Sequence, residues 1–580
     1  MLWRDSWYRT KRDSSPGSPS RSMAASWPAP DARMSYQAYI TASQPTPRTM
    51  RSWYLSGRGM DSFGTDDQPI REAVPVIGAD KLLARVDAIG ICASDAKMIR
   101  LGDGYPLFQG RDLATSPQRL GHELALTVVR VGADLACQYR VGQRLGVQPD
   151  VYYRGQRSAI GSIIAGGFTE YMALGERILR GDGGSYVLPV ADSLSYAEVA
   201  LSEPWACVEA AFRPFRRLNL RSGGLLWISG RSEGFDLDMW LPARLVVASD
   251  ISARTRQQLA QQGAPVVSAD GWNAAQVAQR YGQGVGIDDI ILFEPIARQI
   301  EAAQVALARR AALTIVGQSS SGFAKVDIGR IHYDFINIVG TAQSSLAAVY
   351  GEAANRSGLL PGGVALVHGA GGPMGQMHIL RALSLEQPPG VIIATNRGLG
   401  RLRALAARFA PLASQRGVEF HAISPHETPV RLEATVKSLG GCDDILMMIP
   451  SLAETQRMPD LLRAGGLLNL FAGVPPGQTI RLDMDCIRRD CMRIIGSSGS
   501  SLADQATVLE KTAAGQLDSA GIVSAVGGLG AVKDALLAVN ARRFAGKIVI
   551  YPALGDMPLQ TVSNWSKAAE TALLRERLGE

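Results

Sequence analysis

Cysteines are few and scattered in this sequence of 580 residues, and their spacing argues against a disulfide scaffold. There are six of them, and no two form a C-x-x-C pair. We therefore expect reduced thiols and a cytoplasmic location, because disulfide frameworks need paired cysteines and an oxidising compartment. Aromatic residues make up only 6% of the chain, which disfavours a base-stacking surface for nucleic acid.

Long apolar runs are also missing. The longest suspicious charge-free stretch, residues 357–380, contains glycines, prolines and histidines, which a membrane-spanning helix would not have in such number. We therefore expect a strand, a turn and a helix there, and no membrane partner. The net charge of +7 comes mostly from residues 1–60, and the rest of the chain is nearly neutral. This distribution predicts no basic surface on the folded part that could bind the phosphate backbone of a nucleic acid, and hence no nucleic-acid partner. The 62 glycines instead suit an α/β protein with tight strand-to-helix turns.

Residues 1–49 differ from the rest of the chain. They are rich in Ser, Pro, Arg and Trp and show no apolar periodicity. Two interpretations are open: a transit-like leader, or an over-long start with translation beginning at Met23, Met34 or Met50. We favour the second, because no apolar signal core follows the charges. In either case we predict that residues 1–49 are disordered or a leader and can be removed without loss.

Two kinds of pattern follow this segment. Between about residues 80 and 190, short β-like runs such as KLLARVDAIGIC and LALTVVRVG are separated by glycines, which predicts an irregular β domain. From about residue 222 onward, strand-like and helix-like segments alternate, which is typical of a parallel doubly wound sheet.

The alternating region contains an internal repeat. The strand ending IVG at Gly317 is matched by LFAG at Gly473, and DFINIVGTAQSS around Gly340 is matched by DCMRIIGSSGSS around Gly496. Both pairs of glycines are 156 positions apart. The repeat predicts two nucleotide-fold units in tandem.

The second unit opens with VALVHGAGGPMG, a strand that runs into a glycine-rich turn and then a helix. Backbone N–H groups at such a helix start can hold a pyrophosphate, and glycine lets the phosphates approach closely. The predicted cofactor-binding residues of this turn are Gly369, Gly371, Gly372 and Gly375.

The end of the following strand bears on the choice between NADP and NAD. A free ribose 2′-OH usually meets an acid there, whereas this strand ends at Asn396 and Arg397, which favours NADP. A solvated basic helix face is the alternative interpretation of the same residues. The first unit keeps an acid, Asp250, but its turn offers only Gly230 and Gly234, so we interpret it as a degenerate, structural copy.

Candidate metal ligands lie in the β domain. Residues 1–331 contain a single histidine, His122, in the sequence GHE, while Cys92 ends an apolar strand and Glu203 lies in LSEPWACVEA. A thiolate, an imidazole and a carboxylate make a plausible zinc site with an open position for substrate. A buried thiol and a core histidine remain the alternative, since the spacing is long-range.

Several motifs together resemble the zinc-dependent medium-chain alcohol and polyol dehydrogenases. They run in order along most of the chain and include GICASD, GHE, GGFTEY, LSEPWAC and FAGKIVIYP. The resemblance implies a GroES-like catalytic domain formed from both chain ends, with the nucleotide-binding fold inserted between them. GKIVIYP would then be a catalytic-domain strand that follows the helices.

The resemblance also implies roles for individual residues. Cys92, His122 and Glu123 match metal ligands, and Glu203 matches an acid at or near the metal. Ser94 matches the hydroxyl of a proton relay, and Asp95 matches an acid that orients the histidine. Lys97 stands where many members have a histidine, and the family's structural-zinc cysteines are absent from residues 148–167, so we expect one catalytic zinc and no structural zinc.

The predicted fold class is therefore α/β, a GroES-like irregular β domain plus two Rossmann-like doubly wound units. We expect a zinc-dependent oxidoreductase linked to NADP or NAD that interconverts a secondary alcohol or polyol and its ketone. The partners would be this small molecule and further copies of the chain in a homo-oligomer. The alternative is a non-catalytic nucleotide-binding sensor or scaffold.

The predicted boundaries are 1–49 for the leader, 50–210 for the first part of the catalytic domain, 211–345 for the degenerate unit, 346–505 for the nucleotide-binding unit, 506–553 for the return to the catalytic domain and 554–580 for a C-terminal tail.

Overall fold

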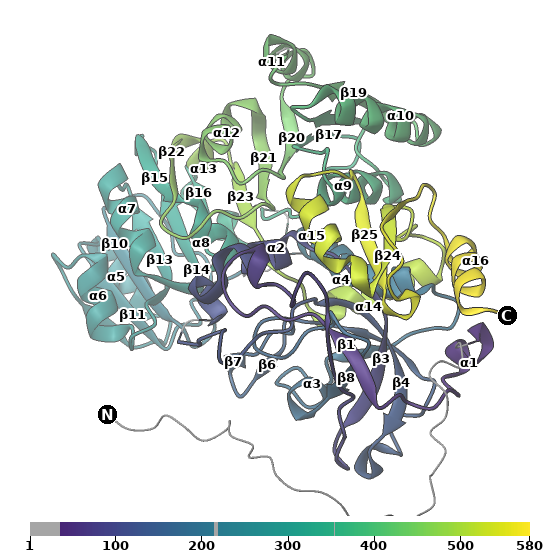
Figure 1. Ribbon diagram of the computed structural model, residues 1–580. Coiled ribbons are helices and arrows are strands. Elements are labelled where there is room, and N and C mark those ends of the chain that lie inside the picture. Colours follow the sequence, from purple (N-terminus) through teal and green to yellow (C-terminus); the bar gives the residue numbers. More distant parts are fainter. Residues whose placement is uncertain (1–34, 109, 214–217, 353, 428) are drawn as a thin grey trace, which may run out of the picture.

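The computed structural model describes residues 35–580 except residues 109, 214–217, 353 and 428. Figure 1 shows a β domain beside two α/β units that lie next to each other along the chain. Within the described residues, no helix combines the length and the apolar character that crossing a membrane requires.

The β domain is built from both ends of the chain. Its eight-stranded sheet runs in the order β26-β24-β25-β3-β4-β5-β9, with β8 paired to β3, so strands from the C-terminal end join strands from the N-terminal half (Figure 1). The central β3 is buried along its whole length, which explains the apolar sequence of that run. The strands are β3 (Leu82–Gly90), β4 (Glu123–Val131), β5 (Arg144–Val147), β8 (Tyr171–Leu174), β9 (Val187–Pro189), β24 (Val523–Gly528), β25 (Lys547–Tyr551) and β26 (Gln560–Thr561).

Smaller elements complete this domain. Helix α4 packs on β3 and β4 and contacts α14, which follows the second unit. The elements are β1 (Thr49–Ser52), β2 (Ile70–Ala73), β6 (Tyr152–Tyr153), β7 (Gln156–Arg157), α2 (Ala93–Leu101), α3 (Glu176–Leu179), α4 (Tyr196–Ala210), α14 (Leu502–Ala513) and α15 (Val532–Asn540).

The first unit is a parallel six-stranded sheet in the order β12-β11-β10-β13-β14-β16. Numbered along the chain, this is the 3-2-1-4-5-6 order of a dinucleotide-binding fold. Its elements are β10 (Leu225–Gly230), β11 (Leu245–Ser249), β12 (Val266–Ser268), β13 (Ile287–Phe293), β14 (Leu307–Val316), β16 (Asn337–Thr341), α5 (Ala253–Ala260), α6 (Ala274–Tyr281), α7 (Ala297–Ala306) and α8 (Ile328–Tyr333).

The second unit has the same parallel strand order, β19-β18-β17-β20-β21-β23. The tandem duplication and the predicted fold class are thus confirmed. Its elements are β17 (Val364–His368), β18 (Val391–Thr395), β19 (Glu419–Ile423), β20 (Cys442–Met447), β21 (Leu462–Leu470), β23 (Arg493–Gly496), α9 (Pro373–Ser384), α10 (Leu399–Gln415), α11 (Pro429–Ser438), α12 (Leu452–Arg457) and α13 (Asp485–Arg488).

A small antiparallel ladder joins the two units. Strand β15 (Phe323–Asp327) of the first unit pairs with β22 (Thr479–Asp483) of the second. Cores of the two units merge beneath this ladder, because buried residues of both belong to one apolar cluster. The units are therefore rigidly associated through packing as well as through the ladder.

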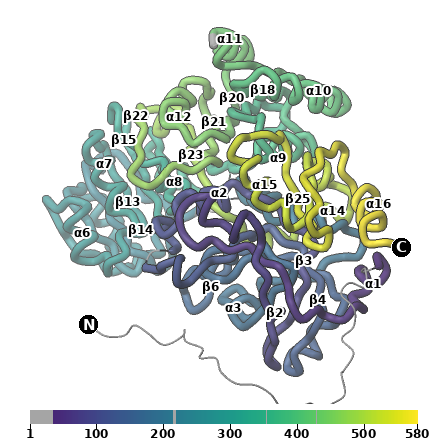
Figure 2. Tube along the Cα trace, in the orientation of Figure 1, coloured from purple at the N-terminus to yellow at the C-terminus, as the bar shows by residue number. Residues whose placement is uncertain are grey.

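The two ends of the described chain lie side by side (Figure 2). Helix α1 (Tyr36–Thr41) buries Tyr39 completely, and the Tyr36 N–H donates to Gly579 O at 2.7 Å beside α16 (Lys567–Leu578). Residues 35–49 thus belong to the fold, which corrects the predicted leader for that part, while residues 1–34 lie outside the described residues. The predicted C-terminal tail is also structured, since Glu570 of α16 accepts the Tyr196 N–H at the start of α4.

Candidate functional site

The antiparallel pairing of β3 with β4 brings the predicted metal ligands together. Gly90, at the end of β3, pairs with Glu123, the first residue of β4, and Cys92 follows two residues later. One ligand atom from each of Cys92, His122 and Glu123 lies within 4.8 Å of the others. Three residues far apart in the sequence thus form a compact set of thiolate, imidazole and carboxylate donors, which suits zinc.

Asp95 ties the two segments of this cluster together. Its buried carboxylate accepts the Cys92 N–H at 3.3 Å, the Gly121 N–H at 3.2 Å and His122 Nδ1–H at 3.3 Å. The Nδ1 bond leaves Nε2 of His122 as the metal-binding nitrogen. Burial lowers the pKa of His122, but Asp95 and Cys92 raise it well above its ordinary value, so a metal ion binding here would displace a proton.

Glu123 tests whether the site fits a metal ion. Its Oε1 accepts from the Lys547 ammonium at 2.6 Å, whereas its buried Oε2 has no hydrogen-bond partner. A Cβ at Gly90 would lie 1.9 Å from this Oε2, so glycine there makes the room for the carboxylate. Since a buried charged oxygen without a partner is costly, the orphaned Oε2 fits a cation as its missing partner.

Glu203 lies outside the three-ligand cluster but within its electrostatic reach. Burial raises the pKa of Glu203 to about 7, with Glu123 raising it and His122 and Lys547 lowering it. Cys207, one helical turn further along α4, lies 3.8 Å from Glu203 Oε1, and burial raises its pKa well above the ordinary value. The structure thus places Glu203 as a neighbour of the cluster, and Cys207 beside it.

The two predicted relay residues lie on α2 in different surroundings. Ser94 Oγ lies 3.4 Å from His122 Nε2, so its hydroxyl is at the metal cluster. Lys97 is exposed on the same helix, and its charge acts on His332 of the first unit. Ser94 is therefore positioned for proton transfer, whereas Lys97 lies toward the first unit.

The predicted glycine turn links β17 to α9. Gly369 has φ +90°, a conformation that side chains disfavour, and a Cβ at Gly375 would lie 2.6 Å from Ala370 Cα. A Cβ at Gly371 would meet Asn396 Oδ1 at 2.3 Å, while one at Gly372 would stand in open space. Close packing at three glycines and free space at the fourth form a cradle for a phosphate group at the start of α9.

The residues after β18 border the same space. Asn396 donates from Nδ2 to Gly398 O at 2.8 Å, and Arg397 is exposed. Arg401 donates to Gly371 O at 3.0 Å and to Phe544 O at 2.9 Å, so it braces the turn instead of extending into solvent. Arg397 is thus the cation at this position that is placed to meet a 2′-phosphate.

One cavity of about 670 Å³ connects the metal cluster with this turn. Its lining includes Cys92 and Lys547 from the β domain and Gly369, Gly372 and Arg397 from the second unit. A cavity of this size, lined from two domains at the carboxyl ends of parallel strands, is where such folds bind dinucleotides.

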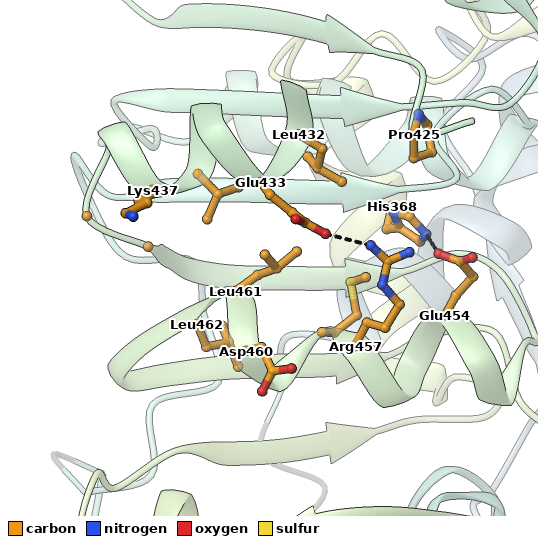
Figure 3. A pocket seen from close by; sticks show the side chains of 14 residues that line it. His368, Pro425, Leu432, Glu433, Lys437, Glu454, Arg457, Asp460, Leu461 and Leu462 are labelled. Atoms are coloured by element: carbon orange, nitrogen blue, oxygen red, sulfur yellow. Dashed lines mark hydrogen bonds and ion pairs between the residues drawn. The ribbon is translucent and has the colours of Figure 1, made fainter. Parts of the chain in front are cut away.

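A second cavity of about 620 Å³ adjoins the first between α11 and α12. His368 and Glu454 line both cavities, and His368 Nε2 lies 3.1 Å from Glu454 Oε2 (Figure 3). Figure 3 places Lys437 at the opposite end and shows the ion pair between Arg457 and Glu433, which is 2.7 Å long. Two pairs of its polar side chains, His368 with Glu454 and Arg457 with Glu433, bind each other, and we assign the cavity no ligand.

Comparisons with known proteins agree with this geometry. Residues 78–180 match the family model of the alcohol dehydrogenase GroES-like domain. The chain is 30% identical over 172 residues to a sorbitol dehydrogenase of Bacillus subtilis, which covers 27% of this chain and 44% of the relative. Residues 78–180 thus carry a domain of the alcohol dehydrogenase GroES-like type, and the curated relatives include polyol dehydrogenases.

Two further similar proteins act on polyol phosphates by their names. A mannitol-1-phosphate 5-dehydrogenase of Aliivibrio fischeri is 27% identical over 239 residues, covering 40% of this chain and 56% of the relative. The solved structure of galactitol-1-phosphate dehydrogenase from Escherichia coli shows 14% identity and a TM-score of 0.47, and the match covers 87% of this chain and 100% of that one. The chain spans about half the length of the curated relatives it matches.

The first unit uses its own side chains where the second unit leaves space. Asp250, the acid at the position where a ribose-binding acid usually lies, accepts the Gly271 N–H at 3.1 Å. Glu294, with φ +48°, accepts the N–H groups of Gln318 and Ser319 at 2.7 and 3.0 Å. These contacts support the interpretation of the first unit as a degenerate copy.

Sequence reasoning missed Lys547 and the contribution of the first unit. Lys547 lies in GKIVIYP, a segment that we had interpreted only as a strand. The lysine after the glycine of this motif is the signal that could have pointed to it. Its ion pair with Glu123 spans residues more than 400 positions apart and depends on the pairing of β25 with β3. No sequence signal indicated that the first unit approaches the catalytic domain.

Proposed function

We propose that the protein is a zinc-dependent, NAD(P)-linked dehydrogenase that interconverts a secondary alcohol of a polyol, or of a sugar derivative, and the corresponding ketone. The observation that carries this proposal is the single cavity that Cys92 and the glycine turn line together. A metal-bound alcohol and a nicotinamide must meet within contact distance for hydride transfer, and this cavity joins their two candidate sites.

Zinc would be held by Cys92, His122 and Glu123, and when bound it supplies a Lewis acid for the alcohol oxygen, while the nicotinamide supplies a hydride acceptor. Asp95 fixes the His122 ring through Nδ1 and holds the Cys92 backbone, so both donors are oriented in advance. Ser94, beside His122 Nε2, would relay the proton of the alcohol hydroxyl, taking it up while passing its own hydroxyl proton outward to solvent. Lys547 neutralises one oxygen of Glu123 and leaves the other available.

Two features support a choice of cofactor and substrate. Arg397, exposed after β18 and lining the cavity, favours the 2′-phosphate of NADP over the free 2′-OH of NAD. The similarity to a sorbitol dehydrogenase and to a mannitol-1-phosphate 5-dehydrogenase supports a polyol or polyol phosphate as substrate.

Metal removal and restoration test this function. The purified chain would be assayed with NADP and NAD against sorbitol, mannitol, arabitol and their phosphates, then dialysed against a chelator and reloaded with zinc. We expect oxidation of at least one polyol, its loss on chelation and its return with zinc. A chain that binds NADPH but contains no zinc and oxidises none of these compounds would instead support the non-catalytic sensor.

A further inference from the structure

The ladder between the two nucleotide units has the symmetry of an interface between identical subunits. In the register of β15 and β22, Lys325 lies opposite Arg481, with Phe323 opposite Asp483 and Asp327 opposite Thr479. Lys325 and Arg481 are 156 positions apart, the same shift that relates the two repeats. Each central residue therefore faces its own repeat equivalent, which is the rule for an isologous two-fold contact.

Contacts flanking the ladder obey the same symmetry. The Ile328 N–H donates to Gln478 O at 3.2 Å, and the Met484 N–H donates to Gly322 O at 3.1 Å. These two bonds are equivalent, because both the donors and the acceptors differ by 156 positions. The first unit therefore holds the second as a second copy of the same unit would.

The reciprocal helices α8 and α13 complete the contact. His332 of α8 donates from Nδ1 to Leu470 O at 2.8 Å, and its equivalent in α13, Arg488, donates from Nη1 to Gly317 O at 2.7 Å. A Cβ at Gly473 would lie 2.3 Å from the His332 ring, and one at Gly340 would lie 3.2 Å from Arg488 Cα. Each helix thus seats against glycines of the opposite unit, where only a missing side chain permits the approach.

Helix α8 lies over the half of the second unit that faces the catalytic domain. It contacts β21 and β23, and a Cβ at Gly496, the last residue of β23, would lie 2.9 Å from His332 Cα. In the 3-2-1-4-5-6 order, β20, β21 and β23 form the half opposite the adenosine-binding strands, which is the nicotinamide half. Residues of the first unit therefore pack against this half of the second unit.

We propose that the first nucleotide unit is an internal partner subunit, which closes the β22 edge of the second unit as a second copy of the chain would. This internal pairing does not rest on the proposed function. The expected homo-oligomer, where it forms, then uses a surface other than this edge.

The internal pairing is tested with cysteines at the symmetric centre. Lys325 and Arg481 are both exposed and directly opposed, so Lys325→Cys/Arg481→Cys places two thiols at a distance that a disulfide can span. After mild oxidation we expect an intrachain bond, identified by peptide mass, with monomer mobility on a non-reducing gel. The single variants Lys325→Cys and Arg481→Cys should stay uncrosslinked at these positions. Covalent dimers through either position, or no bond in the double variant, would overturn the internal partner.

Discussion

The two nucleotide units share one strand order and differ at the carboxyl ends of their strands. In the second unit the turn after β17 carries four glycines and opens into a cavity of about 670 Å³. In the first unit the corresponding places are used by Asp250 and Glu294, whose carboxylates accept backbone N–H groups of their own unit. The repeat therefore retained the sheet and its pairing edge, while only one copy retained the space that a dinucleotide needs.

This difference shows which parts of a nucleotide fold are architectural. Both copies have the same strand order, and each contributes one strand to the ladder and one helix, α8 or α13, to the contact between them. These features serve packing and need no ligand. The turn differs, because packing does not require a glycine at Gly372, where a Cβ would meet no atom within 4 Å. A duplicated unit can thus lose its ligand and still serve as a structural partner.

The largest effect on turnover is expected at the metal cluster. In the described structure, the turn of the second unit lines the same cavity as Cys92, and the turn of the first unit does not. Cys92→Ala or His122→Ala should lower kcat/KM about a thousandfold or more, because the Lewis acid is lost. NADPH affinity, measured by fluorescence titration, should change little, since the glycine turn lies in a different domain. A variant that retained near-normal turnover would show that the cluster is not catalytic.

A substitution in each unit then compares their turns directly. Gly372→Val should weaken NADPH binding about tenfold or more, because its side chain would occupy the cradle while the free space around Cβ leaves folding undisturbed. Asp250→Ala in the first unit is the matched control and should leave the affinity unchanged. The reverse pattern would move the cofactor to the first unit and favour NAD.

Cofactor choice should depend on the residue after β18. Arg397→Ala should raise the Kd for NADPH about tenfold and leave that for NADH within about twofold, because the guanidinium meets only the 2′-phosphate. Calorimetric titration with both cofactors measures the difference. Equal losses for the two would show that Arg397 contacts the shared part of the dinucleotide, or none of it.

The smallest effect is expected in the first unit and concerns stability alone. Glu294→Ala removes the acceptor of two N–H groups, which should cost roughly 2 kcal/mol and lower the Tm by a few degrees. Polyol turnover and NADPH affinity should stay at wild-type values. A loss of cofactor affinity without a change in Tm would mean that the first unit takes part in binding.

Much of the architecture could be predicted from the sequence because it depends on repeated local signals. The shift of 156 positions between Gly317 and Gly473 identified two equal units, and alternating strand and helix patterns identified their class. The motifs around Cys92 and His122 also pointed to one site, and β3 and β4 do bring these residues together. Local sequence patterns suffice to predict a site when its candidate ligands lie at the ends of neighbouring strands.

What the sequence did not indicate depends on contacts between distant segments. The α1 segment lacks apolar periodicity in a window of one and a half turns, yet Tyr39 is fully buried against the catalytic domain and the guanidinium of Arg85 lies 3.6 Å from its ring centroid. Lys547 meets Glu123 only because β25 is added beside β3. His332 reaches Leu470 through the symmetric ladder. Each of these needs the tertiary arrangement, which no single segment encodes.

The central claim is that one chain holds one complete site, built from the metal cluster and the second unit only. The most direct measurement is the stoichiometry of the zinc-loaded protein, with zinc determined by elemental analysis and NADPH by calorimetric titration. The account predicts one zinc and one NADPH per chain, and a Kd for NADPH that is about tenfold or more higher in Gly372→Val than in the wild type. Two NADPH per chain, or one that Gly372→Val still binds with full affinity, would contradict it.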